Sequence, residues 1–455
     1  VRISHQLLFD TLLRLDDKLE VAPGLAESWQ RLTPTRYRFR LKPGVRFHDG
    51  SPLTAGDVAY TFDTLMSPAL GSPYGPVLRE KIASVKRLGP LELEIRLKAP
   101  YASILGDLAV PVRSRRAGRA HPLVGSGPFL LAGRKVNEIR LRRNPLYHGA
   151  PSGVAEVVFK VIRDENTRVL KFLKGTVDLA VNVLPPDKLS MFARSPLRER
   201  YSIIEAPGLS YQYLGFNLRD PLLARKKVRR AIAHAIDVAA LIRYRQKGHS
   251  TAATGLFPPG NPYTPPHLKP LRHDPARARA LLEEAGLPAK DGVRFGLTYK
   301  TSTERAAVIQ ARVIQSDLRK VGIAVQVRSF EWGTFYEDIG KGNFQLFSLR
   351  WIGVSDPDFY YELFHSSRFP PQGRNRGYYA NPALDSLLEA GRLQADPARR
   401  REIYLEVARV VFEDLPYLPL WHNNNVALVA KRLTGFRLHP TGGFQYLAAV
   451  RAAAP

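Results

Sequence analysis

Alternating polar and apolar residues mark the first predicted strands of the chain. Residues 36–42 read RYRFRLK, and residues 91–97 read LELEIRL. A period of two places successive side chains on opposite faces of a β-strand, so each stretch predicts a strand with one buried and one solvated face. The basic side chains of 36–42 then belong to the solvated face of an ordinary strand.

A helix is predicted between these two strands. Thr54 and Asp57 have the spacing of a capping box, in which the two side chains bond the first backbone N–H groups of a helix. Val58, Phe62 and Leu65 then fall on one helical face. The first part of the chain is therefore expected to be a mixed, largely antiparallel α+β unit.

The middle of the chain predicts a different arrangement. Residues 157–162 form a more continuous apolar run, which is typical of a strand covered on both faces. A helix is expected over 165–174, stopped by Gly175, and a strand over 177–184. Strand, helix and strand in this order predict a βαβ unit.

Further helices and strands alternate in the second half. A strand over 210–217 precedes a helix with an apolar stripe and with basic residues on its other face, namely Arg225, Lys226, Lys227, Arg229 and Arg230. Two later helices are expected to begin at Asp274 and Asp396, because each is an acidic N-cap followed by proline. Strands are expected over 323–327 and 345–351, and residues 426–450 predict short strands broken by glycines.

Composition describes a globular chain with a large basic surplus. At roughly 100–200 residues per domain, 455 residues suggest two to four folding units. No stretch reaches the ~18–20 apolar residues that span a bilayer, and the absence of cysteine excludes disulfides and thiolate chemistry. The 68 Lys and Arg against 41 Asp and Glu give a net charge of +27, which raises nucleic acid, an anionic membrane surface or an anionic solute as partners.

The densest basic stretches, 113–119 and 225–230, favour a solvated surface over a nucleic-acid interface. Neither stretch has interleaved aromatic residues for base stacking, and no docking motif is present. Common catalytic and nucleotide-binding motifs are also absent. Gly125-Ser126-Gly127 is expected to be a structural turn. His422 is expected to be a core or surface residue, because the 11 histidines are dispersed and show no metal-ligand spacing.

A series of motifs in one order resembles the bacterial extracellular solute-binding proteins of family 5, the dipeptide-, oligopeptide- and nickel-binding receptors of ABC importers. The main block is 37–58, which reads YRFRLKPGVRFHDGSPLTAGDV, preceded by LAESW at 25–29. The further matches are GSGPF at 125–129, RNPLY at 143–147, GTVDLA at 175–180, YLGFN at 213–217, VRRAIAHAID at 228–237, EW at 331–332 and WIG at 351–353.

The resemblance implies an α/β, two-lobed periplasmic-binding-protein fold of class II type, with mixed sheets, an extra α+β subdomain and a hinge between the lobes. The expected parts are lobe I at 1–22, 120–217 and 435–455, an inserted subdomain at 23–119, and lobe II at 218–434. The chain starts only a few residues before the segment matching 8–12, where family members have a signal peptide and a first strand. We therefore expect a trimmed start.

The function implied by the resemblance is that of a non-enzymatic receptor without a cofactor. Such a protein captures a peptide-like solute between its lobes by strand addition and delivers it to the permease subunits of an ABC importer. It is expected to be a periplasmic or extracellular monomer, with a membrane anchor left open and no nucleic-acid partner. The alternatives are a metal chelate, an oligosaccharide or another anion as solute, with the scattered histidines speaking against nickel, or, in another class, a basic nucleic-acid-binding protein.

The resemblance also points to ligand-contacting residues. Peptide receptors of this family hold the ligand's amino group on an aspartate three residues after the tryptophan that corresponds to Trp351, and this position is Val354 here. Asp356 replaces that anchor only if the loop is reshaped, and losing the anchor costs about 1.5–3 kcal/mol. Core packing is an equal alternative for Trp351, and a turn role is an equal alternative for Asp356. The residues expected to contact ligand are Trp351, Gly353, Val354, Ser355 and Asp356, with Tyr213 and Asn217 as further candidates.

Overall fold

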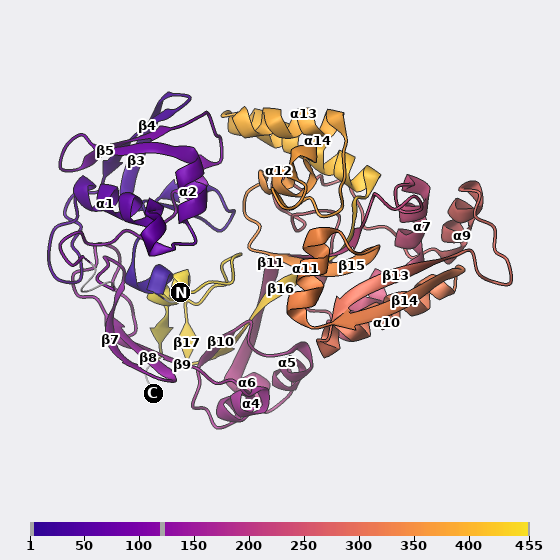
Figure 1. Cartoon of the computed structure of the whole chain (residues 1–455). Coiled ribbons are helices and arrows are strands. Elements are labelled where there is room, and N and C mark those ends of the chain that lie inside the picture. Colours follow the sequence, from indigo (N-terminus) through magenta and orange to yellow (C-terminus); the bar gives the residue numbers. More distant parts are fainter. Residues whose placement is uncertain (1–3, 119–122, 454–455) are drawn as a thin grey trace. The chain divides into compact units, whose positions relative to one another are not determined.

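A computed structural model describes residues 4–118 and 123–453 of the chain. The chain divides into two compact units, Val1–Ala206 with Asn425–Pro455, and Pro207–Asn424 (Figure 1). The expected subdomain boundary at 119/120 and Arg119 of the basic stretch lie outside the described residues. None of the helices among the described residues has the length and apolar character needed to cross a lipid bilayer.

The first unit begins with an antiparallel sheet in the order β3–β4–β6–β5, which comprises β3 (Ala26–Thr33), β4 (Arg36–Leu41), β6 (Glu92–Leu97) and β5 (Ile82–Arg87). β4 alternates strictly between exposed and buried residues, with Tyr37, Phe39 and Leu41 in the core. The exposed Arg36 of this strand pairs with Glu94 at 2.8 Å. The predicted amphipathic strands are therefore confirmed.

Helix α1 (Ala55–Met66) covers part of this core, and its predicted capping box is confirmed. The backbone N–H and the hydroxyl of Thr54 donate to Asp57 Oδ2 at 2.9 and 2.8 Å. Helix α2 (Gly75–Lys81) packs against both α1 and β5. The α+β unit predicted for the first part of the chain is thus present.

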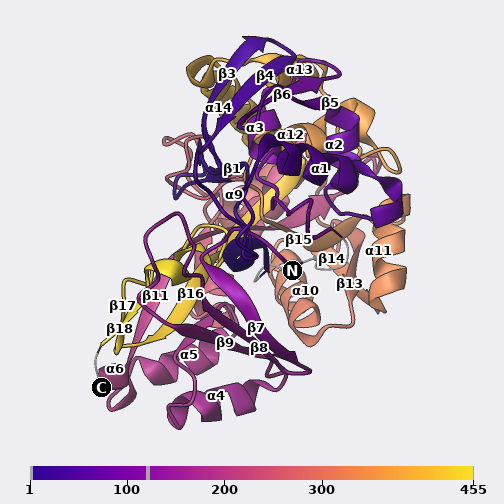
Figure 2. The same ribbon diagram turned by 90° about the vertical axis from the view of Figure 1, so that its left-hand side faces the viewer.

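The predicted βαβ unit is wrong. β9 (Glu156–Lys160) pairs antiparallel with β8 (Glu138–Arg143), which pairs with β7 (Phe129–Lys135), and the three lie side by side in Figures 1 and 2. After α4 (Glu165–Leu173), β10 (Leu179–Val181) joins a different strand, the end of β16 (Tyr417–Ala430), also antiparallel. β9 is half-buried on one face and exposed on the other, so its apolar run does not mark a doubly covered strand.

The second unit contains a mixed sheet in the order β16–β11–β15–β13–β14. β11 (Tyr201–Phe216) pairs antiparallel with β15 (Leu346–Ile352), whereas β13 (Phe295–Ser302) is parallel to both β15 and β14 (Ile323–Phe330). The short β12 (Ser250–Ala252) pairs with β16. The expected strands at 323–327 and 345–351 are therefore confirmed.

Two hydrophobic cores occupy this second unit. The first core holds Leu214, Leu418 and Leu420 together with helices α7 (Lys226–Ala235), α9 (Pro275–Glu284) and α10 (Arg305–Arg319). The second holds Tyr213 and Tyr417 with α11 (Trp332–Lys341), α12 (Phe359–Phe364), α13 (Pro382–Leu393) and α14 (Pro397–Asp414). Alternation along β11 and β16 thus divides their side chains between two cores.

The acidic N-caps predicted the starts of two helices correctly, but the prediction of short strands over 426–450 is wrong. Asp274 and Asp396 accept hydrogen bonds from the backbone N–H groups of Arg277 and Arg399, both at 2.8 Å. The residues after 426 do not form a series of short strands, because β16 continues unbroken to Ala430. Among the described residues after Ala430 there are two short strands, β17 (Leu433–Thr434) and β18 (Arg451–Ala452), which pair with each other.

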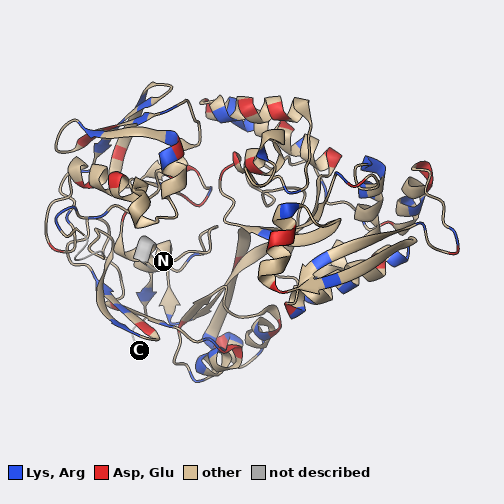
Figure 3. Ribbon diagram, in the orientation of Figure 1, with Lys and Arg blue, Asp and Glu red and all other residues tan. Residues whose placement is uncertain are grey.

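Lys and Arg residues are distributed over helices, strands and loops of both units (Figure 3). One of them corrects the prediction of a solvated face on α7, because Arg229 is only 4% exposed. Its Nη1 donates to the carbonyls of Leu223 and Ala224, both at 2.8 Å, and its Nε donates to that of Leu415 at 3.0 Å. Burial lowers the pKa of this guanidinium, but the carbonyl oxygens satisfy its donors.

Arg229→Gln should lower the free energy of unfolding of the chain by about 3 kcal/mol, because several buried carbonyls lose their donor at once. Differential scanning calorimetry checks this as a lower Tm. Arg230→Gln is the matched control on the same helix and should change stability by less than about 0.5 kcal/mol. Equal Tm values for the two variants would contradict the assigned role of Arg229.

Candidate functional site

The loop that follows β15 carries most of the predicted site residues. Gly353 has φ +73°, a left-handed conformation that favours glycine, and its N–H donates to Leu209 O at 2.9 Å. Val354 is buried, Ser355 is half-buried, and Asp356 stands at the start of the next turn, where its Oδ1 accepts from Asp358 N at 2.8 Å. The loop is thus held by β11 on one side and by its own turn on the other.

A stack of aromatic rings lies beside this loop. Tyr211 is the register partner of Trp351 across the β11–β15 pair, and Tyr213 follows on the same face of β11. The Trp351 and Tyr213 rings are nearly parallel, with centroids 6.2 Å apart, and Tyr417 stacks on Tyr213 at 4.3 Å. These strands therefore build one continuous aromatic surface.

Arg376 lies against this aromatic surface and is only 7% exposed. Its guanidinium carbon is 4.9 Å from the ring centroid of Trp351 and 4.9 Å from that of Tyr336, and Nη2 donates to Tyr336 Oη at 2.6 Å. The buried Asn375 fixes the backbone of this turn, because its side chain donates to His365 O and Tyr379 O at 3.1 and 2.7 Å. The arginine is therefore positioned by stacking and by a rigid turn.

No carboxylate of the described residues forms an ion pair with Arg376. Burial by itself disfavours the guanidinium charge, but the phenol oxygens of Tyr213, Tyr417 and Tyr336 raise the pKa of Arg376 above its ordinary value. The exposed Arg374 adds a second cation, 5.8 Å from the Trp351 ring. Arg374 and Arg376 thus place two cations against one aromatic surface, and the buried Arg376 has no carboxylate partner among the described residues. Such an arrangement can bind an anionic group.

Aromatic side chains border the cluster on α11. Trp332 and Tyr336 are exposed and stack on each other with ring centroids 5.7 Å apart. The exposed Ile352 ends β15 beside the same loop. Of these side chains, Tyr336 lies against the Arg376 guanidinium and offers apolar surface next to it, as ligand sites commonly do.

Asp356 already has a cationic partner within the same unit. Its Oδ1 is 2.9 Å from Nη2 of Arg400, which is buried, while the Asp356 side chain is 39% exposed. Burial lowers the pKa of Arg400, but the Asp356 carboxylate outweighs this effect and raises it. The role of Asp356 as an anchor for a ligand amino group stays a prediction, and any such group would compete with Arg400.

The predicted residues fall into two groups in the structure. Trp351, Gly353, Val354, Ser355 and Asp356 lie in one short segment of the chain, in which Trp351 lies against Arg374 and Arg376. Tyr213 is fully buried within the aromatic stack, and the buried Asn217 donates to Gly342 O and Phe344 O at 3.1 and 2.8 Å. Ligand contact by any of them stays a prediction.

The sequence interpretation missed Arg374, Arg376, Tyr336 and Tyr417. The dipeptide Asn375-Arg376 carries no local motif, and arginine is too frequent in this chain for one of them to stand out. No local signal in the sequence marked these four residues as part of a ligand site.

Ser126 of the Gly125-Ser126-Gly127 motif belongs to a polar cluster in the first unit. Ser126 Oγ donates to Asp10 Oδ2 at 3.0 Å, and His148 Nε2 lies 3.0 Å from the same oxygen. The carboxylate stands between the hydroxyl and the imidazole, so His148 is not placed as a base for Ser126. A Cβ on Gly125 would lie 2.0 Å from Leu8 O, so the close approach of the Leu8 backbone requires glycine at this position.

His422 on β16 is a core histidine, as the core alternative predicted. It is 1% exposed, and its Nδ1 donates to Ser210 O at 3.0 Å. Burial lowers the pKa of His422 to about 4. Within residues 4–118 and 123–453, no group of three or more His, Asp or Glu side chains is arranged to hold a metal ion.

Comparison with known proteins identifies relatives over nearly the whole chain. A family model described as bacterial extracellular solute-binding proteins, family 5 Middle, matches residues 20–370. The dipeptide-binding protein of Escherichia coli (strain K12) is 28% identical over 459 residues, which cover 93% of this chain and 85% of that protein.

Solved structures confirm the predicted fold class. HbpA2 from Haemophilus parasuis superposes with a TM-score of 0.88 at 25% identity, covering 99% of this chain and 94% of that one. The ABC transporter-associated periplasmic binding protein DppA from Helicobacter pylori, in complex with the peptide STSA, superposes with a TM-score of 0.75 at 26% identity, covering 99% and 93%. The α/β architecture with mixed sheets is shared with these proteins.

The lowered pKa of His422 predicts acid sensitivity. The unfolded chain binds a proton at this side chain near pH 6.5, whereas the folded chain does so only near pH 4. Folding stability should therefore be fully present above pH 6.5 and fall as the pH drops towards 4, by about 3 kcal/mol from this residue. Urea unfolding at a series of pH values measures this slope.

His422→Gln should make the pH profile flatter between pH 6.5 and 4. His267→Gln, at an exposed position, is the matched control and should leave the profile of the parent protein unchanged. Parallel profiles for the parent protein and His422→Gln would show that His422 does not contribute to the acid sensitivity.

Proposed function

Because this chain belongs to the bacterial extracellular solute-binding proteins, family 5, we propose that it captures a peptide-like solute outside the cytoplasmic membrane for an ABC importer. Family membership over residues 20–370 supports this proposal, as do relatives named for dipeptide and peptide binding. The receptor hands the solute to the permease subunits and carries out no chemical step on it. It acts as a monomer at a periplasmic or extracellular location.

Arg376 is the observation that carries the proposal at the level of residues. It is a buried cation on an aromatic surface, and no carboxylate of the described chain forms an ion pair with it. A solute carboxylate at this point would supply the missing negative charge through a charge-assisted hydrogen bond. We therefore infer that the solute presents a carboxylate to Arg376, with Arg374 as a second, more exposed contact.

The aromatic side chains supply the remaining recognition. Trp351 and Tyr336 both face the guanidinium, and Trp332 extends their surface towards solvent. Flat apolar faces accept varied side chains, because they need no particular hydrogen-bonding pattern. This cluster would therefore accept solutes with varied side chains, provided that each solute carries a carboxylate.

A free amino group is the less important part of the solute in this proposal. The position that anchors it in related peptide receptors is the buried, apolar Val354. Asp356, the nearby carboxylate, already pairs with Arg400 at 2.9 Å. Peptides with blocked amino ends should therefore bind almost as well as free ones, which separates this chain from receptors that use an aspartate.

A non-peptide anion is the second candidate solute, since Arg374 and Arg376 would also accept its charge. An oligosaccharide without charge, or a cationic metal complex, would leave Arg376 unpaired. The cluster thus favours an anionic solute of either kind, and a titration with peptides separates the two.

The decisive experiment compares a peptide acid with its amide. Isothermal titration calorimetry of the full chain with a tripeptide mixture identifies a binding peptide, which is then titrated as the free acid and as the C-terminal amide. Amidation should weaken binding about 10- to 100-fold, the equivalent of a charge-assisted hydrogen bond of about 1.5–3 kcal/mol. Absence of binding by every peptide would overturn the peptide proposal.

Arg376→Gln should weaken binding of the acid by a similar factor and remove the difference between acid and amide. Arg399→Gln removes one exposed positive charge from α14 and is the matched control, so it should keep the full preference for the acid. If Arg376→Gln preserved that preference, the carboxylate would not be recognised by this arginine.

A further inference from the structure

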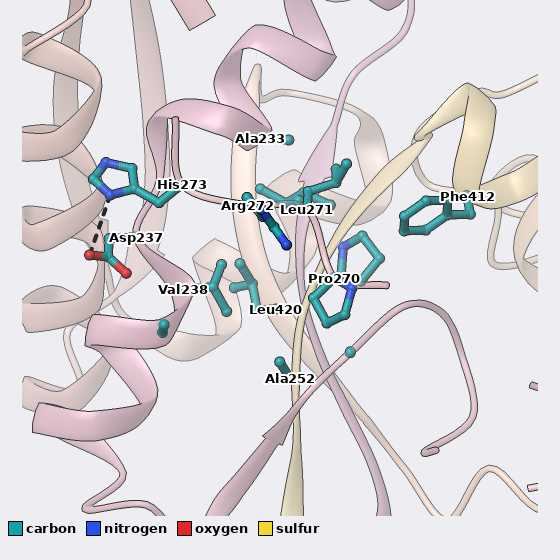
Figure 4. Close-up of a pocket in the computed structure, with 14 residues that line it drawn as sticks. Ala233, Asp237, Val238, Ala252, Pro270, Leu271, Arg272, His273, Phe412 and Leu420 are labelled. Carbon is teal, nitrogen blue, oxygen red and sulfur yellow. Dashed lines mark ion pairs between the residues drawn. The ribbon is translucent and has the colours of Figure 1, made fainter. Parts of the chain in front are cut away.

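A pocket of about 400 Å³ lies in the second unit among β16, α8 (Val238–Ala240) and the segment that precedes α9 (Figure 4). Its wall is mainly apolar, from Ala233, Val238, Ala252, Leu271, Phe412 and Leu420. Both the size and the apolar lining are typical of small-molecule sites. The ionisable side chains on the lining are Arg272, His273 and Asp237.

This pocket is separate from the Trp351–Arg376 cluster. Leu418 and Leu420 of its lining belong to the first core of the unit, with α7, α9 and α10. Tyr417 and Tyr213 of the aromatic stack belong to the second core. None of Tyr213, Trp351, Arg374, Arg376 and Tyr417 lines the pocket. Occupants of the two sites would therefore not compete for the same side chains.

The pocket wall is held in place by hydrogen bonds to the end of α7. His234 Nδ1 lies 2.9 Å from Arg272 O, and Asp274 N donates to His234 O at 2.8 Å. Asp274 is also the N-cap of α9, which fixes the other end of the segment. The site is therefore preformed to a large extent, and little ordering would be needed on binding.

Arg272 is the only charged side chain of the lining without a protein partner among the described residues. It is exposed and lies in the middle of the labelled set, beside Leu271 (Figure 4). The negative group, Asp237, is engaged by His273 Nδ1 at 3.4 Å and by Ala240 N at 2.8 Å. The unpaired charge that the pocket offers to a ligand is therefore positive.

The surrounding chain strengthens this positive character. Residues 225–279 contain twelve Lys and Arg against two Asp, so this stretch holds a large part of the surplus that gives the chain its net charge of +27. A local excess of one sign raises the concentration of ligands of the opposite sign near the pocket. Anions are favoured over neutral and cationic molecules of the same shape.

We propose that this pocket is a second binding site, which takes a small amphipathic monocarboxylate. Its apolar body fills the space between Val238, Phe412 and Leu420, and its carboxylate bonds to the Arg272 guanidinium. A neutral molecule would bury the same apolar area but leave the arginine unpaired, and an ammonium would be repelled by it. The site lies apart from solute capture and does not depend on the proposed function.

The test titrates the full chain with three probes of one chain length: octanoate, 1-octanol and octylamine. Line broadening of the probe resonances in NMR, followed by calorimetry, gives their affinities. Octanoate should bind at least tenfold more tightly than 1-octanol, and octylamine should be the weakest. Failure of octanoate to bind at millimolar concentration, or equal binding of octanoate and octylamine, would overturn the proposal.

Two variants locate the binding. Arg272→Gln should weaken octanoate at least tenfold and leave 1-octanol within twofold, while Lys269→Gln, an exposed position of the same segment outside the lining, should change neither. Ala252→Phe fills the pocket and should weaken both probes. Octanoate binding that survives both Arg272→Gln and Ala252→Phe would place the probe elsewhere and refute the site. A circular dichroism spectrum and a Tm unchanged from those of the parent protein show that each variant is folded.

Discussion

The antiparallel register of β11 and β15 is the constraint on which the candidate site depends. It sets Tyr211 opposite Trp351 and places Tyr213 on the same face, so that two strands far apart in sequence present one aromatic surface. A slip of one residue would turn every one of these rings to the other core, because side chains alternate between the faces of a sheet. The register is in turn fixed by the burial of apolar residues on both faces.

Three buried arginines of this chain have different kinds of partner for their guanidinium groups. Arg229 donates to backbone carbonyls, and Arg400 pairs with the Asp356 carboxylate. Arg376 has aromatic faces and a tyrosine hydroxyl but no carboxylate partner among the described residues. Since burying a charge is costly unless it is paired, Arg376 is the buried arginine at which a negatively charged group would contribute most.

The net charge of +27 has several sources. Part of it lies on the exposed face of β4 and similar strands, where alternation leaves basic residues in water. Part is concentrated between 225 and 279, around a pocket whose unpaired charge is also positive. The arginines beside Trp351 add to the same tendency. The surplus therefore favours anionic solutes through specific side chains, besides any general effect of the field.

The sequence alone determined the features that depend on neighbouring residues. Alternation gave β4, the Thr54–Asp57 spacing gave the start of α1, and acidic N-caps gave the starts of α9 and α14, because each acts within a few residues. The tertiary structure alone decided which strands pair, so β9 and β10 belong to different sheets and form no βαβ unit. It also singled out Arg376, since its surroundings come from Tyr213, Tyr336, Trp351 and Tyr417, residues brought together only by long-range packing.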